Sequence, residues 1–141
     1  MAEAVDFYVS VFDDSSVIQP AGAAQPAIFT LSGERFMAFD GGDVHDFTFS
    51  GANSFFVNCK TADEVDRLWD ALIADGGEPM QCGWLTDKFG VTWQIVPELL
   101  GQLMGDEDRE KANRVMQAML KMVKLDSAKL LEAYEGEPVE A

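Results

Sequence analysis

Gln94 and Thr92 are the residues of this chain whose types and spacing first suggest chemistry. They lie in Val91–Val96, a run rich in Val, Thr, Trp and Ile that predicts a β-strand. Because side chains alternate along a strand, Thr92 and Gln94 share one face while Trp93 and Ile95 share the other. An amide beside a hydroxyl can hydrogen-bond a ligand, so this face is a candidate cavity lining. An ordinary half-exposed sheet face is the alternative.

Three further residues are expected to join this lining from other strands. We predict a ligand-binding set of Gln94, Thr92, Asn58, Phe39 and Trp84. A register shift of one residue would turn Asn58 or Phe39 to the opposite face. A buried amide needs a partner, so Gln94 should bond Asn58, a backbone group, water or a ligand. A polar lining without charge suits a neutral or weakly polar organic molecule.

Other reactive side chains show no pattern typical of catalysis. Cys59 and Cys82 have no metal-type spacing. Lys60 could lower the pKa of a Cys59 thiolate, but no base is near in sequence, so we interpret both cysteines as free buried thiols. Ser54 has no triad context. His45, the only histidine, is interpreted as a surface loop residue.

The composition excludes several classes of function. The 141 residues suit one domain, and 48% of them are hydrophobic, enough for a core. A formal net charge of −15 repels nucleic acid and anionic membranes, although solubility alone would also explain the acidity. The sequence contains neither an apolar stretch long enough to span a membrane nor a signal-type start, so we interpret the protein as cytoplasmic.

The segments that must position these side chains begin with a helix and three strands. The helix is expected over residues 2–12, where apolar residues recur at helical spacing. The turn formers that follow it precede a short strand. A turn at Ser32-Gly33-Glu34 joins two more strands. The expected strands are 16–19, 26–31 and 35–40, followed by an irregular stretch over 43–51.

The second half repeats the pattern and adds helices. Thr61, with Glu64 three residues on, predicts a capping box at the start of a helix that Gly76-Gly77 closes. Asp106 is expected to cap a long helix with a buried stripe from Ala112 to Val123. The expected strands are 53–59, 80–86 and 89–96, with a connector over 98–105 and a last helix from Asp126 to about Tyr134.

This order predicts an α+β fold built from two βαβββ modules. The first module, residues 1–49, lacks its first strand and leaves an open sheet edge. The second, residues 50–97, shows at most three clear strands. With C-terminal helices over 106–135, the whole chain 1–141 is expected to form a single domain.

Three stretches of sequence are similar to a known family. They are Ala4–Phe12, Phe55–Cys59 and Cys82–Pro97. Together they resemble the PhnB-like branch of the glyoxalase/bleomycin-resistance (vicinal oxygen chelate) superfamily, often labelled 3-demethylubiquinone 3-methyltransferase. Arg114–Met122 resembles the C-terminal helix of the same branch. The resemblance implies paired βαβββ modules that curve into an open barrel, and a homodimer.

The resemblance also implies where a metal would bind. Metal-dependent relatives use His, Gln and Glu ligands, and their last strand resembles Asp-x-x-Gly-x-x-x-Glu. Here the same spacing holds Asp87, Gly90 and Gln94, so an amide replaces the carboxylate. The strand at 52–57 offers no histidine, and Asp40 is the only acid near the third ligand position. We therefore predict a site without metal.

Several functions stay open at this point. We predict a small-molecule binding protein that has no metal or cofactor and acts as a homodimer, with no nucleic-acid or membrane partner. Enzymes of the superfamily, either a lyase or a dioxygenase, are the alternative, as is the labelled methyltransferase. However, no glycine-rich turn from strand to helix is present to hold S-adenosylmethionine. An interaction module with a filled cavity is a third reading.

Overall fold

A computed structural model describes residues 1–136 of the chain. It divides into two compact units, residues 1–48 and 49–141. Each unit contains one β-sheet, which confirms the predicted α+β class. The prediction that residues 1–141 form a single domain stays a prediction.

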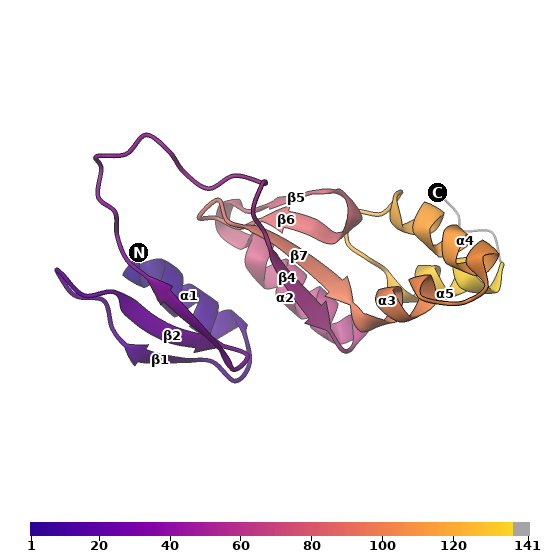
Figure 1. The fold of residues 1–141 in the computed structure, drawn as a ribbon, viewed down its shortest axis with the longest axis horizontal. Coiled ribbons are helices and arrows are strands. Elements are labelled where there is room, and N and C mark those ends of the chain that lie inside the picture. Colours follow the sequence, from indigo (N-terminus) through magenta and orange to yellow (C-terminus); the bar gives the residue numbers. More distant parts are fainter. Residues whose placement is uncertain (137–141) are drawn as a thin grey trace. The chain divides into compact units, whose positions relative to one another are not determined.

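The first unit contains one helix and three strands. They are α1 (Ala2–Val11), β1 (Ser16–Gln19), β2 (Ala27–Leu31) and β3 (Glu34–Ala38), and the strands form an antiparallel sheet in the order β1-β2-β3 (Figure 1). Alternate residues of β2, among them Phe29, are buried on the side where α1 packs. The β2–β3 turn uses Ser32 and Gly33, both at positive φ, which suits the twist of a tight hairpin.

The second unit contains a complete βαβββ module. Its elements are β4 (Phe55–Cys59), α2 (Ala62–Ile73), β5 (Glu78–Pro79), β6 (Trp84–Thr86) and β7 (Thr92–Pro97). The sheet order is β4-β7-β6-β5, with β4 and β7 parallel and the other pairs antiparallel. The expectation of at most three strands here was wrong. The predicted strand over 80–86 is broken because Cys82 and Gly83 have positive φ and form a 3-10 turn.

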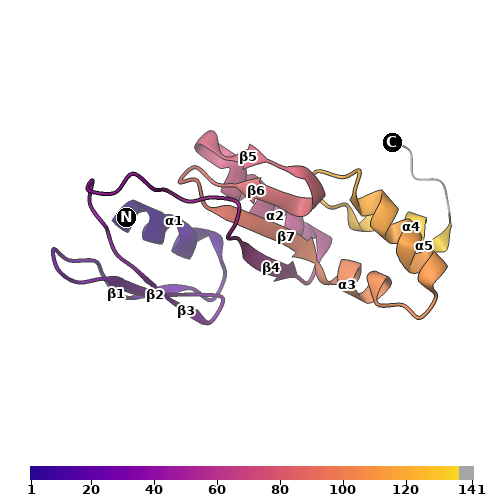
Figure 2. The ribbon, with the colours of Figure 1, turned by 45° about the horizontal axis from the view of Figure 1, so that its top comes forward.

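Helix α2 begins as the sequence predicts and covers one face of this sheet (Figure 2). The Thr61 hydroxyl accepts a hydrogen bond from the Glu64 backbone N–H at 3.1 Å. The Glu64 carboxylate reaches back to the Lys60 N–H at 2.8 Å, one residue before the expected position. The buried side of α2 consists of Val65, Leu68, Trp69 and Leu72.

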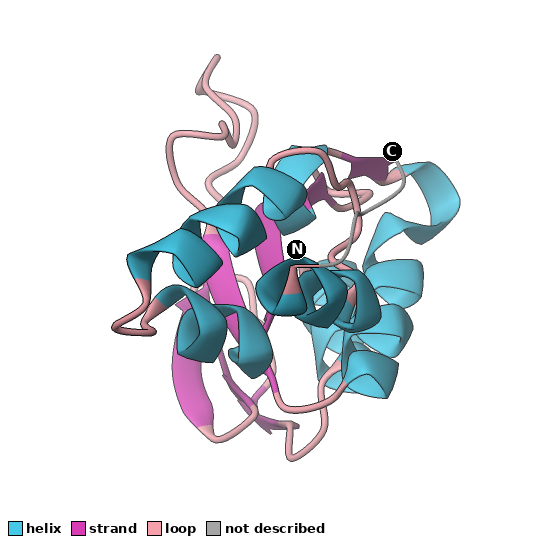
Figure 3. Cartoon of the chain, turned by 90° about the vertical axis from the view of Figure 1, so that its right-hand side faces the viewer, coloured by secondary structure: helices cyan, strands magenta, loops and turns pink. Residues whose placement is uncertain are grey.

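Three helices follow the module: α3 (Glu98–Met104), α4 (Arg109–Met119) and α5 (Ser127–Glu135) (Figure 3). Their shared core includes Val96, Leu100, Val115 and Leu130. Three expectations were wrong. The expected connector 98–105 contains α3, and α4 is capped by Asp108, whose carboxylate accepts the N–H groups of residues 110 and 111. Helix α4 ends at Met119, so the expected stripe does not continue to Val123, and Leu120 and Val123 are exposed.

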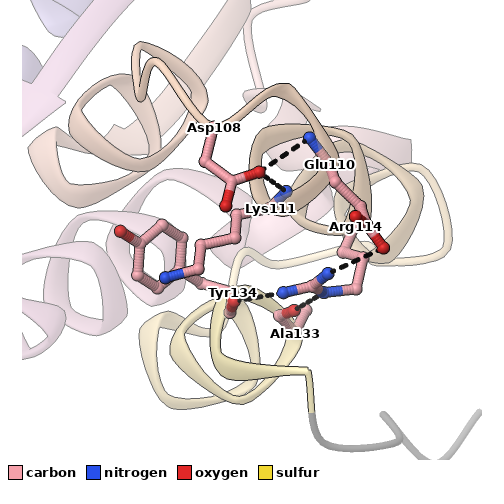
Figure 4. A network of polar contacts seen from close by, with 6 residues as sticks. All are labelled: Asp108, Glu110, Lys111, Arg114, Ala133 and Tyr134. Carbon is pink, nitrogen blue, oxygen red and sulfur yellow. Dashed lines mark hydrogen bonds and ion pairs between the residues drawn. The ribbon is translucent and has the colours of Figure 1, made fainter.

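The last turn of α5 is held against α4 by an arginine and a lysine (Figure 4). Arg114 donates to the backbone oxygens of Ala133 at 3.0 Å and Tyr134 at 2.8 Å. The Lys111 ammonium lies 5.0 Å from the centre of the Tyr134 ring. The Tyr134 hydroxyl donates to Asp106, which lowers the pKa of that carboxyl and raises the pKa of the tyrosine.

Backbone hydrogen bonds attach this helical group to the module. The N–H groups of Cys82 and Gly83 donate to the carbonyls of Met122 and Val123 at 2.9 and 2.8 Å. Gly83 has no room for a side chain, because a Cβ there would lie 2.9 Å from Leu125. Within residues 1–136, no helix has the length and apolar character needed to cross a membrane.

Candidate functional site

The face of the four-stranded sheet opposite α2 carries the predicted polar residues. Pairing in register places Trp84, Gln94 and Phe56 side by side on β6, β7 and β4. The next row joins Thr86 to Thr92. Side chains at paired positions lie on the same face of a sheet. We call the side chains of Ser54, Phe56, Asn58, Trp84, Thr86, Thr92 and Gln94 the open face.

The alternation predicted for β7 is confirmed. Trp93 and Ile95 are buried on the side that α2 covers, with Leu85 of β6. Gln94, one residue from each of them, is half-buried on the other side. The strand therefore separates a packed apolar face from a face that carries hydrogen-bonding groups.

Gln94 forms a hydrogen bond that the sequence analysis did not anticipate. Its amide nitrogen donates to the Ser54 hydroxyl at 2.9 Å. Asn58, the expected partner, instead donates to the Glu98 carboxylate at 3.4 Å. The bond to Ser54 fixes the amide, so its carbonyl oxygen is left to accept a hydrogen bond from outside the protein.

Thr92 lies beside Gln94 with an unused hydroxyl. The residue is 2% exposed. Its hydroxyl oxygen is buried and has no hydrogen-bond partner within the described part of the chain. Buried polar groups almost always have a partner, so an orphaned one calls for an explanation. An enclosed water, or a bound molecule that displaces the groups over the hydroxyl, would supply the partner.

Two aromatic rings flank Gln94. Trp84 is half-buried, whereas Phe56 is 60% exposed. Sequence reasoning missed Phe56 and Ser54, although the signal was present. Alternation along β4 places Ser54, Phe56 and Asn58 on one face, so the prediction of Asn58 implied the other two.

Phe39 is the predicted site residue that belongs to the first unit, whereas the other four belong to the second. It follows β3 in the first unit and is 72% exposed. Its participation in a site with Gln94 stays a prediction.

Asp87, the acid of the Asp-x-x-Gly spacing, is used inside the protein. One carboxylate oxygen accepts the backbone N–H groups of Phe89 at 2.9 Å and Val91 at 3.1 Å, and the other accepts the Trp93 indole N–H at 2.8 Å. These bonds hold the β6–β7 turn and orient Trp93 on the α2 side. The carboxylate thus organises the strand that carries Gln94.

The donor set does not fit the divalent metal that the superfamily resemblance implies. Residues 1–136 contain no group of three or more His, Cys, Asp or Glu arranged to hold an ion. Asp40 accepts the Gly42 N–H at 2.9 Å, and His45 is an exposed residue stacked on Phe47. Gln94 alone would supply a weak neutral ligand, which is poor for retaining a divalent ion.

The cysteines offer no nucleophile on this face. Cys59 is fully buried, and the pKa of its thiol is raised to about 12. Burial is the main cause, and the negative charge of the nearby Glu64 is the second. A thiol with that pKa stays protonated at neutral pH and does not attack substrates. Cys82 is half-buried, so the expectation of a buried thiol is confirmed only for Cys59.

Comparison with known proteins relates the chain to one family. The sequence model of the 3-demethylubiquinone-9 3-methyltransferase family matches residues 1–96. A putative 3-demethylubiquinone-9 3-methyltransferase, PhnB protein, from Bacillus cereus is 35% identical, with a TM-score of 0.61 over 67% of this chain and 88% of that one. Protein PA1353 from Pseudomonas aeruginosa is 22% identical, with a TM-score of 0.54 over 68% of this chain and 87% of that one. No curated protein matches the sequence significantly.

The family match ends just before the C-terminal helices. Residues 97–141 lie beyond it, so the predicted likeness of Arg114–Met122 to a helix of this family stays a prediction. The open face itself, from Ser54 to Gln94, lies inside the matched region.

Proposed function

The chain belongs to the 3-demethylubiquinone-9 3-methyltransferase family, in its PhnB-like branch, and we propose that it binds a neutral small molecule on the open face without a metal ion. The orphaned hydroxyl of Thr92 is the observation that carries this proposal. Beside it, the Gln94 amide is fixed by Ser54 and has an acceptor to offer. A ligand that bonds the Gln94 amide and displaces the groups that bury the Thr92 hydroxyl would satisfy both.

The charges around the open face support a neutral ligand. The seven side chains of the open face carry no charge. Two acids lie at its borders: Glu78 is opposite Thr86 in the β5–β6 register, and the Glu98 carboxylate accepts a hydrogen bond from Asn58. An anion would meet these carboxylates and a chain of net charge −15.

The side-chain amide signal of Gln94 provides a direct test. It can be assigned in a ¹⁵N NMR spectrum by its loss in Gln94→Leu. A set of neutral fragments, aromatic and aliphatic, is then titrated into the full-length protein. The proposal expects at least one fragment to shift the Gln94 signal saturably and to bind more weakly to Thr92→Val. Fragments that shift only other signals, or none, would contradict it.

Methyl transfer is the second candidate, since the family and the Bacillus cereus protein carry that name. The fold gives it little support. Within residues 1–136, β4 is joined to α2 through Lys60-Thr61, and β7 runs directly into α3, so neither strand-to-helix junction has the glycines that cradle a nucleotide-like cofactor. Saturable calorimetric binding of S-adenosylmethionine would favour this candidate over simple ligand binding.

A lyase or dioxygenase activity would require a metal that the described donor set does not hold well. Elemental analysis of protein purified without chelators separates this candidate from the first. Stoichiometric zinc, iron or manganese that is lost in Gln94→Leu would favour an enzyme of the superfamily.

We also propose a cytoplasmic homodimer, as the sequence and the family suggest. Exposed apolar side chains on the first unit, Ile18, Met37 and Phe39, support an interface. The predicted helical stripe from Ala112 to Val123 supports it less than expected, because α4 ends at Met119 and Ala112 and Val115 are buried within the chain. A stable monomer in sedimentation at micromolar concentration would contradict the dimer.

A further inference from the structure

We infer that the segment joining α4 to α5, residues 120–126, positions Trp84 on the open face, with Leu125 and Lys124 as the positioning residues. The inference rests on the proposed function only in taking Trp84 as a site residue. It goes further in naming a part of the chain that shapes the site without belonging to it. This joining segment lies beyond the matched family model, which ends at residue 96.

The turn directly before Trp84 has a backbone that needs support. Cys82 and Gly83 have φ values of 61° and 82°, in the left-handed region. That region is unfavourable for a residue with a Cβ, so Cys82 keeps it only where its surroundings hold it. The turn closes onto β6, because the Trp84 N–H donates to the Gln81 carbonyl and the Trp84 carbonyl accepts the Met80 N–H at 2.8 Å. The course of the turn therefore sets the position of the Trp84 backbone.

The joining segment supplies this support (Figure 1). Both N–H groups of the turn donate to its carbonyls, Cys82 to Met122 at 2.9 Å and Gly83 to Val123 at 2.8 Å. The Leu125 side chain lies so close to Gly83 that an added Cβ would be 2.9 Å from it. Leu125 is itself 2% exposed within the helical core, so its own position is fixed.

Lys124 fastens the same segment to α2. Its ammonium lies 2.6 Å from the Asp66 carboxylate. The hydrogen bond to Asp66 is the main cause that raises the pKa of Lys124, so the ammonium stays charged at neutral pH. The segment is thus attached to the module at two points, the turn before β6 and the helix on the opposite face of the sheet.

Trp84 depends on this support more than its neighbour Gln94 does. It pairs with Gln94 of β7 on one side, but β5 pairs only with Leu85 and Thr86 on the other. The first residue of β6 is therefore held by the sheet from one side and by the turn from the other. A shift of the turn should move the Trp84 ring while Gln94 stays in place.

Two pairs of variants of the full chain separate positioning from general stability. Leu125→Ala and Leu130→Ala each shorten a leucine that is at most 2% exposed in the same helical core, but Leu125 is the one among the closest contacts of Gly83. Lys124→Gln and Lys121→Gln each remove one positive charge from the joining segment. Lys124 forms the ion pair with α2, whereas Lys121 is exposed.

The readouts, taken without ligand, are amide hydrogen exchange at Cys82 and Gly83 and the indole N–H signal of Trp84, assigned by its loss in Trp84→Phe. We expect exchange at the two amides to rise about tenfold or more in Leu125→Ala and about threefold in Lys124→Gln, and the Trp84 signal to shift in both. Leu130→Ala and Lys121→Gln should leave the Trp84 signal in place, because a loss of stability alone does not move it well below the unfolding midpoint.

Equal shifts of the Trp84 signal within each pair of variants, or no shift in Leu125→Ala and Lys124→Gln, would overturn the inference. If Leu125→Ala does not fold, the lysine pair decides. A neutral fragment that shifts the Gln94 signal in the parent should also bind more weakly to Lys124→Gln than to Lys121→Gln. If no fragment binds the parent, the proposed function fails, while the Trp84 signal still decides the inference.

Discussion

Replacing Thr92 with valine should stabilise the ligand-free protein, although removing a buried hydroxyl usually removes a hydrogen bond and lowers stability. The hydroxyl is buried at a residue 2% exposed and has no partner in residues 1–136, so it loses water on folding without recovering a hydrogen bond. Such a loss costs about 1–3 kcal/mol. Valine has nearly the same shape and suits a strand, so the substitution should recover most of that cost.

The assay is urea unfolding followed by circular dichroism, with thermal unfolding as a check. A gain of 1 kcal/mol corresponds to a rise in Tm of roughly 3 °C for a chain of this size. Thr30→Val is the matched control, because Thr30 also lies in a strand and its hydroxyl accepts the Ser16 N–H at 3.2 Å. The control should lose about 0.5–1.5 kcal/mol, the usual value of one hydrogen bond.

A Thr92→Val protein that is less stable than the parent would refute the reasoning. It would mean that the hydroxyl has a partner in solution, and the observation carrying the proposed function would lose its force. If the parent protein is purified with a ligand in place, the gain should emerge only after the ligand is removed.

Three further outcomes are expected. Gly83→Ala should lower the free energy of unfolding by about 2–4 kcal/mol in urea titrations. The added Cβ would lie 2.9 Å from the Leu125 side chain, and the backbone at this position has a positive φ. An unchanged midpoint would show that helices α3 to α5 can shift to make room. Cys59 should react with a thiol reagent only after unfolding, since burial raises its pKa to about 12; rapid labelling of native Cys82→Ser protein would contradict this. The hydrogen bond from Tyr134 lowers the pKa of Asp106 below its ordinary 3.8, so the ionised carboxylate should stabilise the fold above pH 3.8, and this contribution should be lost as pH falls through the lowered pKa. Asp106→Asn should therefore be less stable than the parent at neutral pH, with a difference that shrinks as pH falls below 3.8. A difference that does not change with pH would argue against the bond.

Local features were the easiest to predict from sequence. The Thr61 cap, the turn at Ser32-Gly33 and the two faces of β7 depend on neighbouring residues only, and each agrees with the structure. The cap of α4 was misplaced because Asp106 and Asp108 are both good caps two residues apart. The structure uses Asp108 for the helix and Asp106 for Tyr134.

Long-range features could not be read from the sequence. The parallel pairing of β4 with β7 joins residues about 40 positions apart, and it alone brings Ser54 and Phe56 to Gln94. Strand register carries no local signal of comparable strength. The break at Cys82 was also hidden, because a cysteine rarely takes positive φ and here does so where its N–H meets Met122.

The central claim is that the open face binds a neutral molecule at Thr92 and Gln94 without metal. Electron density over these two residues, in crystals of protein purified without chelators, tests it most directly when combined with X-ray absorption scans for zinc, iron and manganese. We predict density for a small organic molecule, or for the ordered solvent that such a molecule would replace, within hydrogen-bonding distance of the Thr92 hydroxyl and the Gln94 carbonyl. The absorption scans should show no metal. A metal ion coordinated through Gln94, or side chains that fill the space above it, would contradict the claim.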